Sequence, residues 1–522
     1  MARKFYIRTF GCQMNEADSE RLAGVLEADG MEPTTDLEGA DVVVLNTCCI
    51  RENADNKLYG NLGMLKSLQV EHPGMQIAVG GCLAQKDKEL IQLRAPHVDA
   101  VWGTHNVARA AELLREAAAE GPVMEVLEVA PEDQGYASAL PVRRKCAHAA
   151  WVTIQVGCDN SCAFCIVPAV RGPEVSRPFG ELVAEVEGLA RAGVVEVTLL
   201  GQNVNSYGRD ITLSLRSAPV GKIEPGVPPG GKPLPTSPGP FAPQPAGVAL
   251  SGLAGRPTGA DWRAGAAWVA DGRGRARPLF GDLLRAVGAV PGISRVRFTS
   301  PHPKDLRPET IAAMAETPAV CEHLHLPLQS GSDATLAAMR RGYTAERYLA
   351  RLAAARAAID DLAVTTDIIV GFPGETEDDF SATLEVVAEA AYDSAYTFIF
   401  SPRPGTRAAQ MSESFVPPEV VAERFERLTV VVQRSALARH EARVGRVEEV
   451  VIEGPSKRDP SRTSGRTRQN KLVHFAPPPG APLAPGSFAR VQVTSAAPHY
   501  LGGELVSVAP GSGRRRIPLQ VR

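Results

Sequence analysis

The sequence predicts an α/β protein made of three parts: an N-terminal open parallel α/β sheet, a central partial (β/α)6 barrel and a small C-terminal β-barrel. Three observations support this prediction. Three early strand-like segments each end at a cysteine, six strand–helix units follow, and short alternating segments broken by Pro and Gly close the chain. A chain of 522 residues is too long for one ordinary core, so we expect two to four domains.

The composition is typical of a soluble globular protein, with 44% hydrophobic and 22% charged residues. The first residues lack the apolar stretch of a signal peptide, and no later stretch approaches about 18 apolar residues. We therefore expect a cytoplasmic protein without membrane contact. Structural disulfides are rare in that compartment, so the nine cysteines indicate metal or redox chemistry.

The first predicted domain, residues 1–120, repeats a strand that runs directly into a cysteine. The segments KFYIRTFGC, DVVVLNTC and QIAVGGC end at Cys12, Cys48 and Cys82, with helical patterns between them. In an open parallel sheet, residues that follow strands gather at the carboxyl edge, where ligands usually bind. The sequence therefore predicts that three distant thiols converge.

A linker over residues 120–145 leads into the second predicted domain, residues 145–440. A helical stretch at 417–443 closes this domain, and residues 211–278 interrupt it with 12 Pro and 12 Gly without period. We expect this stretch to be a disordered surface insertion without assigned function. The six expected barrel strands are VTIQV, EVTLLG, RVRFTS, HLHLPL, TTDIIVGF and AYTFIF.

The third predicted domain, residues 441–510, is the small β-barrel. Residues 441–522 hold 13 Lys and Arg against 6 Asp and Glu, whereas residues 1–440 hold 43 against 53. This imbalance indicates either a polyanionic partner or a solvated basic tail. Six basic residues in one loop-like segment are candidates for phosphate contact: Lys457, Arg458, Arg462, Arg466, Arg468 and Lys471.

The segment VGCDNSCAFC places Cys158, Cys162 and Cys165 in one loop after the first barrel strand. A structural zinc ion normally has four protein ligands, so this loop needs a remote fourth ligand to bind zinc. Three thiolates on a 4Fe-4S cluster leave one iron free for chemistry. The spacing favours the cluster and leaves zinc as the alternative.

With Phe164 before the last cysteine, this spacing is similar to the radical S-adenosylmethionine signature. The segments IVPAVRGPEVSRP, EVTLLGQNVNSYG, LHLPLQSGSD and GFPGETEDDF resemble the methylthiotransferase branch of that superfamily, and the resemblance covers nearly the whole chain outside 211–278. It implies a 4Fe-4S cluster held by Cys158, Cys162 and Cys165, whose free iron chelates S-adenosyl-L-methionine.

The same resemblance implies a second 4Fe-4S cluster held by Cys12, Cys48 and Cys82. Cys49, beside Cys48, could substitute for it, but the family pattern favours Cys48 and leaves Cys49 as a packed free thiol. Cys146 and Cys321 match no motif and are taken as structural. No side chain is assigned a catalytic role.

The segments GCQMNEADSERL and NTCCIREN resemble the tRNA-2-methylthio-N(6)-dimethylallyladenosine synthase branch, and the last domain resembles the TRAM domain. The resemblance implies radical conversion of N(6)-isopentenyladenosine, next to the anticodon, to its 2-methylthio form. The expected partners are the tRNA anticodon loop and an external electron donor, and a monomer is expected. The alternatives are a methylthiotransferase acting on a ribosomal-protein aspartate and a non-catalytic iron-sulfur protein that binds RNA.

Three other polar motifs have ordinary structural interpretations. Glu375 in GFPGET fits a cofactor contact and a helix-capping turn equally well. Ser332 and Asp333 are typical of a helix start, although the backbone there could also bind a carboxylate. His302 is typical of a buried histidine whose hydrogen bonds are satisfied.

Overall fold

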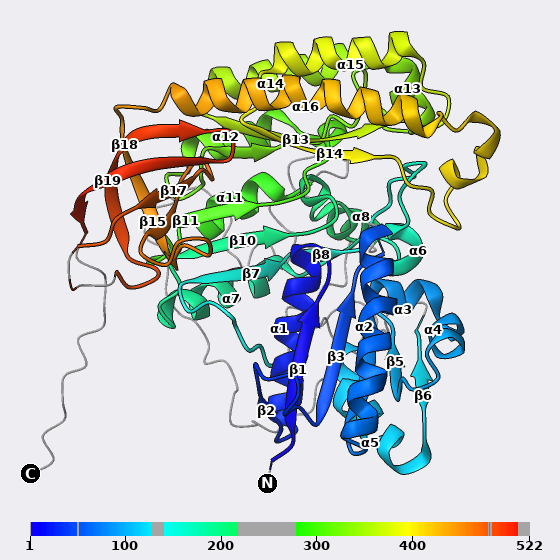
Figure 1. Ribbon diagram of the computed structural model, residues 1–522. Helices are drawn as coiled ribbons and strands as arrows, with labels where there is room; N and C mark the ends of the chain where they lie inside the picture. Colours follow the sequence, from blue (N-terminus) through cyan, green and yellow to red (C-terminus); the bar gives the residue numbers. More distant parts are fainter. Residues whose placement is uncertain are drawn as a thin grey trace, which may run out of the picture.

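The computed structural model in Figure 1 describes residues 2–49, 52–127, 140–217, 278–478, 480 and 483–509. These residues form the three predicted parts. The blue N-terminal sheet lies below the central barrel, and the red C-terminal barrel lies at one end of it (Figure 1). None of the described helices is long and apolar enough to span a membrane.

The N-terminal sheet has six parallel strands in the order β2-β1-β3-β4-β5-β6. Helices α1 and α5 cover one face and helices α2, α3 and α4 cover the other. Strand β6 belongs to this sheet although it lies past residue 120, where we expected the linker to begin. The elements are β1 (Lys4–Thr9), α1 (Gln13–Ala28), β2 (Glu32–Pro33), β3 (Val42–Thr47), α2 (Glu52–Glu71), β4 (Gln76–Gly81), α3 (Cys82–Asp87), α4 (Glu89–Arg94), β5 (Ala100–Trp102), α5 (Ala110–Glu120) and β6 (Val123–Glu125).

The central part is the predicted partial (β/α)6 barrel. Its strands form two parallel sheets, β7-β10-β11 and β12-β13-β14, which a bridge between Val296 and Val320 joins. The strands are β7 (Ala149–Thr153), β10 (Glu196–Leu200), β11 (Arg295–Phe298), β12 (His323–His325), β13 (Ala363–Val370) and β14 (Ser394–Ile399). Two short antiparallel strands, β8 (Gln155–Val156) and β9 (Val175–Ser176), pair as a separate small sheet.

Helices cover the outer face of the barrel. Along β13, the side chains of Val364, Ile368 and Val370 are buried in the core against these helices, so the alternate residues face the lumen. The helices that pack in this core are α7 (Phe179–Arg191), α11 (Phe280–Gly288), α12 (Pro308–Glu316), α13 (Asp333–Ala338), α14 (Ala345–Ala358), α15 (Glu377–Ala390) and α16 (Pro418–Glu441). Two further helices of this part are α6 (Val167–Arg171) and α8 (Arg209–Ser217).

The segment predicted as an insertion, residues 211–278, is described only in part. Helix α8 extends to Ser217, so the first residues of the segment are helical rather than disordered. Residues 218–277 lie outside the described residues.

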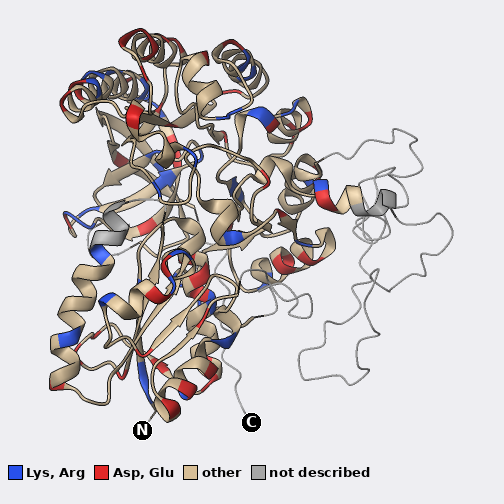
Figure 2. Cartoon of the chain, turned by 90° about the vertical axis from the view of Figure 1, so that its right-hand side faces the viewer, with Lys and Arg blue, Asp and Glu red and all other residues tan. Residues whose placement is uncertain are grey.

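Figure 2 shows Lys and Arg interspersed with Asp and Glu along the helices at the top of the view.

The C-terminal part is a closed five-stranded barrel in the order β15-β16-β17-β19-β18, as predicted. Its core contains Ile452, Phe475 and Val491. The strands are β15 (Val447–Pro455), β16 (Thr463–Thr467), β17 (Leu472–Phe475), β18 (Phe488–Ala497) and β19 (Tyr500–Val508).

The turn between β16 and β17, residues 467–471, attaches this small barrel to the central one. Arg297 of β11 donates hydrogen bonds to the carbonyl oxygens of Thr467 and Arg468, both at 2.8 Å. Lys471 Nζ donates to Asp393 Oδ1, just before β14, at 2.7 Å. The turn therefore covers the amino ends of the central strands, opposite the edge at which their loops carry cysteines.

Candidate functional site: two groups of thiols

The loop with Cys158, Cys162 and Cys165 lies between β8 and α6, at the carboxyl edge of the central barrel. Its middle is fixed by Ala163, whose backbone N–H donates to the carbonyl of Met339 and whose carbonyl accepts from the N–H of Ala408, both at 2.9 Å. Because those partners come from loops after β12 and β14, the thiol loop is fixed to the rim of the barrel.

The three thiols are half-buried. Burial, together with the nearby thiols of Cys162 and Cys158, raises the pKa of Cys165 to about 12. Two polar side chains also approach the sulfur atoms: Arg341 Nη1 lies 3.3 Å from Cys162 Sγ, and Asn160 Nδ2 lies 3.5 Å from Cys158 Sγ. The donor set is three soft ligands with a cation beside them, which suits an anionic iron-sulfur cluster.

Among the described residues, no three or more Cys, His, Asp and Glu side chains are arranged to hold a single metal ion. A single zinc ion needs its thiolates at about 2.3 Å from one centre. A 4Fe-4S cluster instead spreads three thiolates over three irons. The three soft thiolates of the loop suit a cluster, whereas a structural zinc ion would need a fourth ligand from elsewhere in the chain.

Buried side-chain oxygens without a hydrogen-bond partner gather at the same edge. Such orphaned atoms are rare in folded proteins and indicate a missing polar partner. Within the described residues, five of them lie at or just after the carboxyl ends of barrel or hairpin strands: Thr153 Oγ1, Gln155 Oε1, Gln202 Oε1, Asn205 Oδ1 and Gln329 Oε1. This rim therefore fits a polar ligand such as S-adenosylmethionine next to the thiol loop.

The second group of thiols lies where the strand-end argument predicted. Cys12, Cys48 and Cys82 follow β1, β3 and β4, which are neighbours in the sheet. Glycines make room for this convergence. Gly11 (φ 146°) and Gly81 (φ 94°) both have positive φ, and a Cβ on Gly11 would lie 2.5 Å from Cys48 Cβ.

Cys49 is a free thiol packed in the apolar cluster of the sheet, as expected. It is buried, but it also forms a hydrogen bond with Cys82, just as Cys48 does with Cys12. These hydrogen bonds, together with the charge of Arg171, lower the pKa of Cys12 and Cys82 despite burial. Four thiols therefore meet here, and two of them favour the thiolate form that metal binding requires.

A single short helix joins the two groups. Helix α6 begins two residues after Cys165, and its Val170 packs in the same cluster as Cys49 and Cys82. At its end, Arg171 is buried and pairs with Asp18 of α1 at 2.7 Å. A five-residue helix is only about 7.5 Å long. The two groups of thiols therefore lie near opposite ends of α6.

The sequence did not single out Arg171 or Arg341. A charged residue at the end of the apolar segment IVPAVR is the one local signal for Arg171. The other two cysteines lie elsewhere: Cys146 contacts His148 Nδ1 at 3.1 Å before β7, and buried Cys321 precedes β12. Both positions are at the amino ends of strands, which supports a structural role.

The six basic residues of the C-terminal barrel do not form one loop, so that expectation was wrong. Arg466 lies in β16 and pairs with Glu453, Arg468 pairs with Glu322, and Lys471 is buried against Asp393. The three exposed residues are Lys457, Arg458 and Arg462, between β15 and β16. Four of the 13 basic residues counted in 441–522 are arginines of residues 510–522, outside the described residues.

Sequence comparisons decide the family. Residues 4–103 match the uncharacterized protein family UPF0004, residues 152–226 and 259–387 match the Radical SAM superfamily, and residues 441–506 match the TRAM domain. The chain is 48% identical over 506 residues to the tRNA-2-methylthio-N(6)-dimethylallyladenosine synthase of a Nocardioides species, covering 96% of this chain and 88% of that one. The corresponding protein of Acidothermus cellulolyticus is also 48% identical, with coverage of 96% and 87%.

The chain belongs to the family of tRNA-2-methylthio-N(6)-dimethylallyladenosine synthases. It is a radical SAM methylthiotransferase, and membership of that superfamily implies S-adenosylmethionine and a 4Fe-4S cluster. Among solved structures, the radical S-adenosylmethionine methyltransferase TsrM from Kitasatospora setae has a TM-score of 0.46 and 13% identity, covering 78% of this chain and 77% of that one. The cobalamin-dependent radical enzyme OxsB has a TM-score of 0.41, 10% identity and coverage of 82% and 56%.

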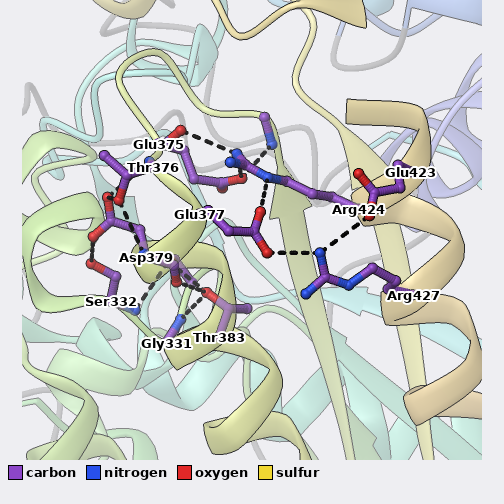
Figure 3. Close-up of polar contacts among 12 residues, drawn as sticks. Gly331, Ser332, Glu375, Thr376, Glu377, Asp379, Thr383, Glu423, Arg424 and Arg427 are labelled. Atoms are coloured by element: carbon purple, nitrogen blue, oxygen red, sulfur yellow. Dashed lines mark hydrogen bonds and ion pairs between the residues drawn. The ribbon is translucent and has the colours of Figure 1, made fainter. Parts of the chain in front are cut away.

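In this member of the synthase family, the motifs QSGSD and GFPGET stabilise the rim (Figure 3). Ser332 caps α13 and donates to Asp379 Oδ1 at 2.5 Å, while Asp379 and Thr376 form a capping box at the start of α15. Glu375 accepts a hydrogen bond from Arg424 Nη1 at 2.9 Å. These contacts tie the loops after β12 and β13 to each other.

His302 is a buried structural histidine, as its sequence context indicated. Its Nδ1 accepts a hydrogen bond from the backbone N–H of Lys304 at 3.2 Å and caps a short 3-10 helix. Burial, with the charge of Arg341 next in size, lowers the pKa of His302 to about 2. The imidazole therefore stays neutral.

Proposed function

We propose that this protein converts N(6)-isopentenyladenosine, next to the anticodon of tRNA, to its 2-methylthio derivative. The 48% identity to synthases named for this product supports the proposal. The structural observation that carries it is the pair of thiol groups at the two ends of α6, because sulfur transfer to an activated base needs both centres to reach one substrate.

Each thiol group has its own part in this proposal. Cys158, Cys162 and Cys165 hold the 4Fe-4S cluster that binds S-adenosylmethionine, beside the unpaired oxygens of the rim. Cys12, Cys48 and Cys82 hold a second 4Fe-4S cluster. When bound, these groups supply the radical chemistry and the sulfur, whereas the protein supplies placement.

The side chains of the protein hold the two centres in position and exclude water between them. Arg171 and Asp18 fix α6 against α1, and Ile166 and Val170 seal the junction with apolar contacts. Ala163 holds the thiol loop to the rim through its two backbone hydrogen bonds. A base stacked in the anticodon loop has to be splayed out to reach this place, which costs a few kcal/mol.

The C-terminal barrel contributes RNA contacts through its exposed cations. Lys457, Arg458 and Arg462 lie on the surface between β15 and β16, where phosphates can reach them. The tRNA anticodon loop is the substrate segment, and an external donor supplies the electrons. We further propose that the protein works as a monomer in the cytoplasm, where clustered thiols stay reduced.

Mass spectrometry of modified nucleosides tests the proposal. Deleting the gene should remove 2-methylthio-N(6)-isopentenyladenosine from tRNA and leave N(6)-isopentenyladenosine in its place. The wild-type gene should restore the product, and a Cys162→Ala gene should not. Unchanged tRNA, together with loss of methylthio-aspartate from a ribosomal protein, would instead support the protein-modifying alternative. A wild-type protein that binds RNA but cleaves no S-adenosylmethionine after anaerobic reconstitution would support the non-catalytic alternative.

A further inference from the structure

Three polar or aromatic residues face the lumen of the central barrel and take no part in the site described above. They are His325 of β12, Asp367 of β13 and Tyr396 of β14. Their neighbours Leu324 and Ile368 are buried in the core, and Ala395 packs against it, so the alternation of each strand turns these three side chains inward. Asp367 and Tyr396 are paired in the register of β13 and β14.

The three side chains form one surface. His325 Nε2 lies 3.4 Å from Asp367 Oδ2, and its Nδ1 lies 3.0 Å from Thr365 Oγ1. The rings of His325 and Tyr396 meet edge to face, with centroids 6.1 Å apart. Tyr396 is nevertheless 56% exposed, which is unusual for an aromatic residue inside a barrel. The surface therefore offers an open ring face beside a carboxylate.

Packing relates this surface to elements that lie near both groups of thiols. Two residues along β13 from Asp367, Ile369 packs in the cluster that includes Ala163 of the thiol loop. Two strand residues span about 7 Å. On the other side of the lumen, Trp151 of β7 packs in the same cluster as Cys12. A flat ligand on Tyr396 would therefore lie below the thiol loop and face the strand, β7, whose Trp151 packs in the same cluster as Cys12.

We propose that Tyr396 and Asp367 bind the substrate base, a purine with an N–H on its exocyclic nitrogen, and that His325 positions Asp367. The inference rests on the proposed function and names the residues that recognise its substrate. Base stacking on an aromatic ring is sequence-tolerant, because every base has a π-face. The carboxylate adds selectivity. When it is ionised it accepts hydrogen bonds and donates none, so it favours a base that presents an N–H.

Binding of an anticodon stem–loop RNA tests the stacking contact. The probe carries 2-aminopurine at the target position, whose fluorescence reports whether the base is stacked. We expect Tyr396→Leu to weaken binding about 5- to 150-fold, equivalent to the ~1–3 kcal/mol of base–aromatic stacking, and to change the fluorescence of the complex. Tyr396→Phe keeps the ring and should behave like wild type. Ile399→Ala is the matched control, because Ile399 is also exposed on β14 but faces outward.

A second pair of probes tests the carboxylate. One stem–loop carries N(6)-isopentenyladenosine, and the other carries the same base with a methyl group replacing the N(6)–H. Wild type should bind the first more tightly, and Asp367→Ala should lose this discrimination. A structural defect would weaken both equally. The inference fails if wild type forms the methylthio product while Tyr396→Leu and Asp367→Ala bind both probes as wild type does. Wild type that forms no product would instead overturn the proposed function.

Discussion

Arg171 and Asp18 form an ion pair at 2.7 Å that joins the end of α6 to α1, and so links the two domains that carry the thiol groups. Both side chains are largely buried, and Arg21 also lies 3.5 Å from Asp18. Arg171 additionally acts on Cys12 and Cys82 through its charge. This contact therefore helps to hold the two domains together and adds positive charge beside the second group of thiols.

Removing this carboxylate should destabilise the protein. Asp18→Asn leaves Arg171 buried beside a neutral amide, and an unpaired buried charge costs on the order of 3 kcal/mol. The free energy of unfolding from denaturant titration measures the loss. Asp29→Asn is the control, because Asp29 pairs with the exposed Arg115, and exposed ion pairs contribute at most about 1 kcal/mol. Equal effects of the two substitutions would contradict the role given to Asp18.

Cys162→Ala should abolish reductive cleavage of S-adenosylmethionine and lower the iron content of reconstituted protein from about eight to about four atoms per chain. Binding of tRNA should remain, because the exposed cations Lys457, Arg458 and Arg462 lie in another domain. Iron analysis and deoxyadenosine formation measure the two effects. Cys146→Ala is the control, because its thiol contacts His148 before β7. Cofactor cleavage by the Cys162 variant would refute the assignment of the thiol loop.

Replacing Lys457, Arg458 and Arg462 together by Ala should weaken tRNA binding and flatten its dependence on salt. Each lost phosphate contact lowers the slope of log K against log salt by about 0.7–0.9. Arg468→Ala should leave this slope unchanged and lower stability, since Arg468 pairs with Glu322. Binding isotherms at several salt concentrations separate the two classes, and an unaltered slope in the triple variant would remove this surface from the RNA interface.

His440 should make stability depend on pH. Burial, followed by the charge of Lys471, lowers the pKa of His440 to about 4 in the folded protein, where its Nδ1 donates to the carbonyl of Ala497 at 2.6 Å. The unfolded chain binds the proton near pH 6.5, so stability is present above that pH and is lost as pH falls toward 4. His440→Gln should flatten the change between pH 6.5 and 4 relative to wild type. Parallel curves for the two proteins would exclude this titration.

The fold was predictable because local sequence patterns indicate most of its strands and helices. Strands that end at Cys12, Cys48 and Cys82, and the alternation of strand and helix after residue 149, needed no long-range information. The roles of Arg468 and Lys471 were not predictable, because their partners Glu322 and Asp393 lie far away in the sequence. Likewise, only the folded register brings Asp367 and Tyr396 together.

Cys49 was expected to be a packed free thiol, and its hydrogen bond with Cys82 was not predicted. Adjacent residues in an extended segment point in opposite directions, so the sequence alone favours only one of Cys48 and Cys49 for the group. The segment leaves β3 immediately before these residues, and its path there depends on contacts with the neighbouring strands. The surrounding sheet, rather than the local sequence pattern, therefore places the Cys49 thiol beside Cys82.

The turn over residues 467–471 covers the end of the central barrel at which its strands begin. Because Thr467, Arg468 and Lys471 are bonded to the amino ends of its strands, the small barrel covers this end of the lumen, and the rim with the thiol loop lies at the opposite end. Substrate and spent cofactor would then both pass through this rim. The order in which the two enter and leave then becomes part of the catalytic cycle.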